Sequence, residues 1–204
     1  MQAAHEHSSE RPPCLLPPAK FCWTTAESAA TLPSRLGIQI PTFIDMDSYS
    51  TIRLLALVSS GLVAGAMAAH TVVLGTILTW LLHERRPQEL HTLLDGYRKR
   101  YLARIIAYWV LFGFHFLAIS VFAVAASLAG RGGSQAIAAA VIGAPLWVGI
   151  HLATFGRLEA KAMATPEALT EPERARFVRF NGVLHVFYAL CLCASFVLVA
   201  LTPA

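Results

Sequence analysis

Four histidines lie in apolar segments of this sequence, and their side chains are the ones best suited to chemistry. An ionisable side chain is rare inside a membrane and usually marks a functional site there. Two histidines facing one another on neighbouring helices can be the axial ligands of a b-type haem, or can hold a smaller metal such as copper or iron. The sequence therefore predicts haem or metal ligands at His70, His115, His151 and His185.

The depth of each histidine, counted from the charged end of its apolar segment, sorts the four into two pairs. His70 and His115 lie about 12 or 13 residues from that end, which is roughly 18–20 Å along a helix. His151 and His185 lie about 5 residues from it, or roughly 7–8 Å. We therefore expect one pair near the middle of the membrane and the other nearer the cytoplasm. The ends used for these counts are Leu82, Leu102, Gly156 and Phe180.

Aromatic and amide side chains share the helical faces of these histidines, at spacings of three, four or seven residues. They are candidates to contact the histidines and so fix the orientation of the imidazole rings, although aromatic residues are also common anchors at membrane interfaces. Two alternatives to a cofactor site stay open. The histidines can form a proton or substrate path, or can pack as neutral polar groups worth about 0.6 kcal/mol each. The supporting residues are Tyr108, Trp147, Asn181 and Tyr188.

The segments that carry the histidines are long and nearly free of charge. Of the 204 residues, 56% are hydrophobic and 14% are charged, against about a quarter charged in soluble domains. Each segment is long enough to cross the hydrocarbon core of a bilayer as a helix. The sequence therefore predicts an all-α, polytopic four-helix bundle that contacts lipid and binds no nucleic acid. The predicted spans are 52–82, 103–129, 135–156 and 179–201.

The first 45 residues differ from the rest of the chain. They are rich in proline and polar residues, and they contain no apolar run long enough for a signal peptide. We expect residues 1–45 to be a disordered tail. Met46 stands directly before the first apolar segment, so translation from Met1 or from Met46 fits the sequence. Residues 46–204 are then a single membrane domain.

Local signals place the ends and irregularities of the helices. Residues 88–95 are expected to form a short amphipathic turn that Gly96 ends, and Pro145 is expected to kink the third helix. Thr170 and Glu173 have the spacing of a capping box before the fourth helix. The helices are expected over residues 50–83, 98–129, 134–163 and 171–201.

Positive charge is strongly unequal on the two sides of the predicted bundle. Eleven Lys and Arg residues lie in segments 83–104 and 157–179, whereas Arg53 and Arg131 alone lie close to the membrane on the other side. Cytoplasmic loops carry the excess of positive charge in membrane proteins. Both longer loops are therefore predicted to be cytoplasmic and both termini outside, as in a multi-pass protein of a bacterial inner membrane.

A stripe of small residues runs along the first predicted helix. Gly61, Gly65 and Ala69 are spaced by four and share one face. Small residues at this spacing let the backbones of two membrane helices approach closely. We expect the stripe to pack against another helix, either within the bundle or in a homo-oligomer or a complex with a membrane partner.

Three short stretches resemble the small four-helix membrane proteins of the anthrone-oxygenase-like family. They are SGLVAG at 60–65, HLATFGRLEA at 151–160 and RFVRFNGVLH at 176–185. The resemblance implies a four-span fold and a cofactor-poor oxygenase or a related membrane oxidoreductase. The family pattern has an asparagine near the end of the third helix, where this chain has His151, so no catalytic residue is transferred.

Three classes of function are compatible with the sequence. The leading hypothesis is a membrane redox or oxygenase-type protein that uses intramembrane histidines. The alternatives are a non-enzymatic partner subunit or structural module, and a small transporter or proton path. A bound chromophore or metal would distinguish the first class from the others.

Overall fold

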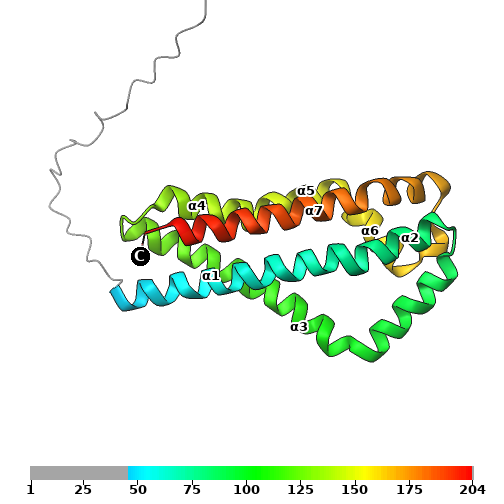
Figure 1. Ribbon diagram of the computed structural model, residues 1–204, viewed down its shortest axis with the longest axis horizontal. Helices are drawn as coiled ribbons and strands as arrows, with labels where there is room; N and C mark the ends of the chain where they lie inside the picture. Colours follow the sequence, from blue (N-terminus) through cyan, green and yellow to red (C-terminus); the bar gives the residue numbers. More distant parts are fainter. Residues whose placement is uncertain (1–45, 204) are drawn as a thin grey trace, which may run out of the picture. The chain divides into compact units, whose positions relative to one another are not determined.

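In the computed structural model, residues 46–203 can be described, and they form a bundle of apolar helices (Figure 1). The predicted tail at 1–45 lies outside the described residues. No strand occurs within 46–203, and the four long helices match the four predicted spans. The all-α, four-span prediction is therefore confirmed. The helical spans run Met46–His83, Pro87–Leu128, Gly133–Thr154 and Glu171–Leu201.

The first span begins close to the end of the fourth. The Tyr49 hydroxyl donates to the Pro203 carbonyl at 2.9 Å, and the Arg131 guanidinium lies 4.9 Å from the centre of the Tyr49 ring. The turn at Gly130–Gly132, which enters the third span, is therefore at the same end. The 84–86 turn lies at the opposite end, near α6 (Figure 1). This is the alternating arrangement that four successive membrane crossings require.

The orientation predicted from charge can be tested by cysteine labelling in intact cells. A cysteine placed at Ser134 is expected to react with a membrane-impermeant reagent, because the turn beside it lies at the end that is poor in positive charge. A cysteine at Gln88 is expected to be protected until the cells are permeabilised. Labelling of Gln88→Cys alone would show that the bundle has the opposite orientation.

The first span is interrupted by a wide turn at its histidine. It consists of α1 (Met46–Ala69), the π-helical turn η1 (His70–Gly75) and α2 (Thr76–His83), whereas a single regular helix was predicted. A π-turn places one extra residue in the helix and leaves backbone groups free, and such turns occur often at functional sites. The Gly75 carbonyl accepts a bond from the Asn181 side chain at 3.1 Å.

The second span starts earlier than predicted. Helix α3 (Pro87–Leu128) is continuous through Gly96 and bends at Tyr101, which has φ −125° and ψ 23° (Figure 1). The predicted break at Gly96 is therefore wrong. Glycine inside a helix costs only about 1 kcal/mol. That cost is offset because Leu90 and Leu94, in the part of α3 that precedes the bend, are buried in the core.

The third span ends at Thr154, and the helix that follows it runs in a different direction. It comprises α4 (Gly133–Val141), a π-turn η2 (Ile142–Leu146) that contains Pro145, and α5 (Trp147–Thr154). The single helix predicted over 134–163 is wrong at Phe155, where φ is −129° and ψ is −25°. The buried Phe155 ring packs 5.3 Å from the Phe177 ring. The non-helical backbone at Phe155 turns helix α6 (Gly156–Ala164) in a new direction, and the packing of the Phe155 ring holds it there.

The fourth span has the cap that the sequence predicts. A short 3₁₀ turn, η3 (Pro166–Ala168), leads to α7 (Glu171–Leu201). The Thr170 hydroxyl accepts the Glu173 amide, and the Glu173 carboxylate accepts the Thr170 amide at 2.8 Å. These reciprocal bonds satisfy two donors that the first turn of a helix would otherwise leave free.

The buried core changes along the bundle. The end that holds the Gly130–Gly132 turn is rich in alanine and includes Ala126, Ala136 and Ala139, while the end that holds the 84–86 turn is built on leucine and phenylalanine. Trp147 and Tyr188 dominate the middle. Many large apolar side chains point outward, as lipid contact requires. Examples are Val72, Val110, Leu117, Leu152 and Val183.

The small-residue stripe of α1 divides between two environments. A Cβ on Gly61 would lie 3.3 Å from the Phe196 ring, so this glycine allows close packing against α7. A Cβ on Gly65 would meet nothing within 4 Å, and Gly65 and Ala69 are exposed. Packing within the chain therefore uses Gly61. An oligomer formed through Gly65 and Ala69 remains a prediction.

Candidate functional site

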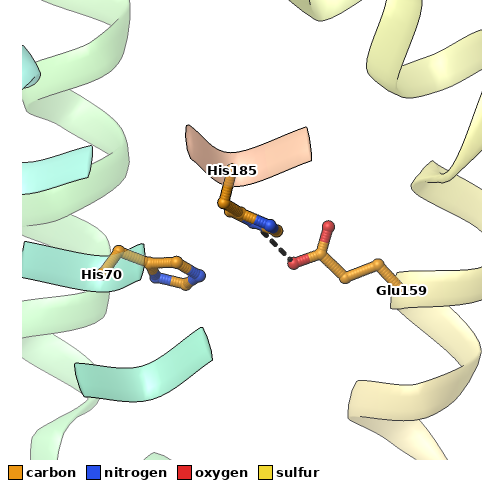
Figure 2. Close-up of side chains that lie close together, drawn as sticks. All are labelled: His70, Glu159 and His185. Carbon is orange, nitrogen blue, oxygen red and sulfur yellow. Dashed lines mark ion pairs between the residues drawn. The ribbon is translucent and has the colours of Figure 1, made fainter. Parts of the chain in front are cut away.

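Three polar side chains from three separate elements converge in the half of the bundle nearer the 84–86 turn. His70 comes from η1, Glu159 from α6 and His185 from α7, and Figure 2 shows all three pointing toward a common space. One ligand-type atom from each lies within 4.8 Å of the others. The bend at Phe155 is what returns α6 toward the two histidines.

The protonation of His185 is set by its own helix. Its Nδ1 lies 2.8 Å from the Asn181 carbonyl oxygen, which can only accept, so Nδ1 carries the proton. The Nε2 atom then presents a lone pair toward Glu159 Oε1, 3.5 Å away. Two electron-rich atoms facing one another favour a proton or a metal cation between them. A backbone carbonyl behind a metal-binding histidine is a common arrangement.

His70 completes the group from the first span. Its ring stacks on the His185 ring with centres 5.0 Å apart, and on the Tyr108 ring at 6.4 Å. Its Nε2 atom is buried and has no hydrogen-bond partner among residues 46–203. A buried polar nitrogen without a partner is costly, and binding a metal is one way to satisfy it.

Glu159 links the group to a third histidine. Its Oε2 atom lies 3.5 Å from Nε2 of His151, and its side chain is only 17% exposed. Glu159 lies beyond the third span, on α6. Burial by itself raises the pKa of this carboxyl, but the interaction with His185 in its protonated form, and the charges that His151 and His70 carry when protonated, together lower it by more. The Glu159 pKa is therefore below its ordinary value, which favours the carboxylate form.

The predicted supporting residues surround this group. The Asn181 side chain donates to Gly75 O and to the Thr79 hydroxyl at 3.0 Å, which fixes α7 against the first span. The Tyr188 ring lies 5.6 Å from the rings of both His151 and His185, and its buried hydroxyl has no partner among the described residues. Trp147 contacts Tyr188 at 5.5 Å.

His115 lies elsewhere in the bundle. It is fully buried, with Nδ1 3.4 Å from the Ser59 hydroxyl and Nε2 3.4 Å from the Gly143 carbonyl. The predicted pairing of His70 with His115 is therefore wrong. Ser59 precedes His70 by eleven residues, or about 16 Å of helix, so His115 is level with a point much nearer the end that holds the Gly130–Gly132 turn.

The depth estimate failed because of where α3 was taken to begin. Tyr108, seven residues before His115, is the α3 residue that stacks on His70. Because charged residues continue to Arg104, the depth was counted from Leu102. Helix α3 is in fact helical from Pro87 and bends at Tyr101, so Leu102 does not mark the level at which this helix enters the bundle. By contrast, His151 and His185, the other predicted pair, both approach Glu159.

Glu159 was not predicted, because it lies just outside the apolar run that ends at Arg157. One signal in the sequence points to it. It is the only acidic residue from Gly96 to Pro166, in a stretch that contains two of the four span histidines. Its approach to His70 depends on the bend at Phe155, which hydropathy does not reveal.

Comparison with known protein families, with curated proteins and with solved structures finds no match to this chain. The site is therefore interpreted from its own geometry.

Proposed function

We propose that this chain is a multi-pass membrane metalloprotein of redox or oxygenase type. His70, Glu159 and His185 hold one first-row divalent metal near the inner end of the bundle. The proposal rests on the convergence of two imidazoles and one carboxylate within 4.8 Å, with His185 held in the tautomer that leaves Nε2 free. Two histidines and one carboxylate form the donor set of non-haem iron oxygenases.

The distances suit a small ion. Bonds from imidazole or carboxylate to such a metal are about 2.0–2.2 Å long, so two ligands of one ion lie no more than about 4.4 Å apart. The ligand atoms of the group lie within 4.8 Å of one another, so a shift of about 0.4 Å brings the widest pair within reach of one ion. Three protein ligands leave positions open for oxygen or substrate.

A b-type haem fits this group less well. Axial ligands must point their nitrogens at each other from opposite faces of a flat macrocycle. The His70 and His185 rings instead stack with an angle of 22° between their planes. His115, the other predicted ligand at the middle of the membrane, contacts Ser59 and Gly143 and is not part of the group. A single iron or copper ion is therefore the preferred cofactor.

The setting and the family are part of the same proposal. The unequal positive charge supports an orientation with the metal group toward the cytoplasm, and the proposed setting is a bacterial inner membrane. The stretches that resemble the anthrone-oxygenase-like family suggest oxygen-dependent chemistry, whereas the metal is proposed from the geometry of the histidine group alone. His151 then stands beside Glu159 at 3.5 Å, where it can exchange a proton with the carboxylate.

The proposal is tested by metal analysis of the purified protein. Wild-type protein loaded with Fe²⁺ without oxygen, or with Co²⁺ as a visible probe, is expected to retain one ion per chain after desalting. Glu159→Ala is expected to lower the affinity by more than about 100-fold, because it removes a direct ligand.

Glu167→Ala is the matched control, since Glu167 pairs with His91 at 2.8 Å on the exposed surface. It is expected to retain the ion fully. Equal retention by wild type and both variants, or no retention by any of them, would rule out the proposed centre.

A proton path is the second candidate, and one observation favours it. Four titratable side chains form a continuous series in the order His151, Glu159, His185 and His70. The Glu159 carboxylate oxygens lie 3.5 Å from Nε2 of His151 and from Nε2 of His185, and the His185 ring stacks on the His70 ring. A path of this kind needs no metal. Proton uptake into vesicles by metal-free wild-type protein, lost in Glu159→Ala, would support it over the metal centre.

A further inference from the structure

A cavity of about 620 Å³ lies beside the end of the third span, apart from the histidine group. It is formed by the last turn of α5, the start of α6 and the first turns of α7. These elements meet where the apolar run ends, so the cavity lies at the level of the membrane surface. Its main lining residues are Leu152, Thr154, Arg157, Leu158, Lys161 and Arg176.

The polar side of this cavity is positively charged. Arg157, Lys161 and Arg176 face one acid, Glu173, which pairs with Lys161 at 2.7 Å. Arg176 donates to the Thr154 carbonyl at 3.0 Å, which holds its guanidinium against α5. Arg157 has no ion pair or hydrogen bond from its side chain within residues 46–203. Two positive charges are therefore not neutralised by the protein.

The other side of the cavity is apolar. Leu152 is 66% exposed and Leu158 is partly buried, and both lie next to the basic residues. An occupant that matches both sides needs an anionic group and an apolar body. Arginine binds phosphate through two parallel hydrogen bonds, and basic pockets between helices at the cytoplasmic surface suit lipid head groups.

We propose that this cavity binds the phosphate group of an anionic amphiphile, with a membrane phospholipid as the occupant. Arg157 and Arg176 bind the phosphate, and Leu152 and Leu158 contact the first part of the acyl chain. The proposal goes beyond the metal centre and does not depend on it. Leu158 of the cavity and Glu159 of the histidine group are adjacent on α6, so an occupant also holds this helix in place.

The experiment uses the full-length protein in bilayer discs of phosphatidylcholine, with and without phosphatidylglycerol. Lipids retained by the protein after extraction into mild detergent are counted by mass spectrometry. Wild-type protein is expected to retain phosphatidylglycerol selectively. Arg157→Gln is expected to lower that retention about fivefold, since one surface arginine contributes about 1 kcal/mol to binding anionic lipid. This variant breaks no bond within the bundle.

Arg100→Gln is the matched control, because Arg100 lies over the Tyr101 ring on α3 and not in the cavity. It is expected to retain phosphatidylglycerol as the wild type does. An equal loss in both variants would show binding to total positive charge and would overturn the proposal. So would selective retention that Arg157→Gln leaves unchanged.

A second arm distinguishes a lipid from a soluble phosphate compound. Either phosphatidylglycerol or inorganic phosphate is added to the protein in neutral detergent, and the thermal unfolding of each sample is followed. Stabilisation by phosphatidylglycerol but not by phosphate supports the phospholipid. Stabilisation by phosphate alone, lost in Arg157→Gln, overturns the phospholipid and assigns the cavity to a soluble phosphate. Metal content in the same samples reports on the histidine group separately.

Discussion

His185→Ala is expected to abolish metal binding, with the affinity lowered by more than about 100-fold. The variant loses Nε2, which faces Glu159, and the ring on which His70 stacks. Only His70 and Glu159 would remain, and two ligands from separate elements are not held together without the third. The measurement is the stoichiometry of Fe²⁺ or Co²⁺ after desalting, with folding checked by thermal unfolding in detergent.

His115→Ala is the control for a buried histidine of the same bundle. It leaves the metal group intact and is expected to keep full metal binding. Its cost is in stability, about 2–5 kcal/mol, because removal of the fully buried ring leaves a cavity, while the Gly143 carbonyl keeps its bond from Trp147 and the Ser59 hydroxyl its bond to Ala56. Loss of metal in His115→Ala together with retention in His185→Ala would instead support a site shared by His70 and His115.

Gly143→Ala is expected to destabilise the bundle by about 2–3 kcal/mol, because the added methyl group overpacks a tight contact between two spans. A Cβ at this position would lie 2.5 Å from the Ser195 hydroxyl oxygen and 3.2 Å from Ile119 Cδ1. Ser195 cannot move away freely, since it donates to the Ala139 carbonyl at 2.9 Å. Unfolding by heat or by a denaturing detergent, against wild type, measures the loss.

Gly149→Ala is the matched control in the same span. A Cβ on Gly149 would meet nothing within 4 Å, so the substitution adds no clash. It is expected to be neutral or to stabilise the protein by up to about 1 kcal/mol, since alanine favours helix over glycine. Equal stability of Gly143→Ala and wild type would mean that η2 and α7 are not packed as closely as described.

The number of spans, their approximate positions and one helix end follow from the amino-acid sequence alone. These properties are local. A long run of apolar residues must be helical to satisfy its backbone hydrogen bonds in a membrane, and it spans when it is long enough. The capping box of Thr170 and Glu173 was also predictable, because both of its partners lie within one turn of the chain.

The composition of the site was decided by the tertiary structure. Counting residues from an assumed membrane edge placed His115 beside His70, although α3 presents Tyr108 to that ring. The bend at Phe155 brings Glu159, which lies outside every apolar run, to His185. Which side chains meet depends on where each helix bends and how far it has turned. Those features are set by contacts between distant segments, such as Phe155 with Phe177, and not by local hydropathy.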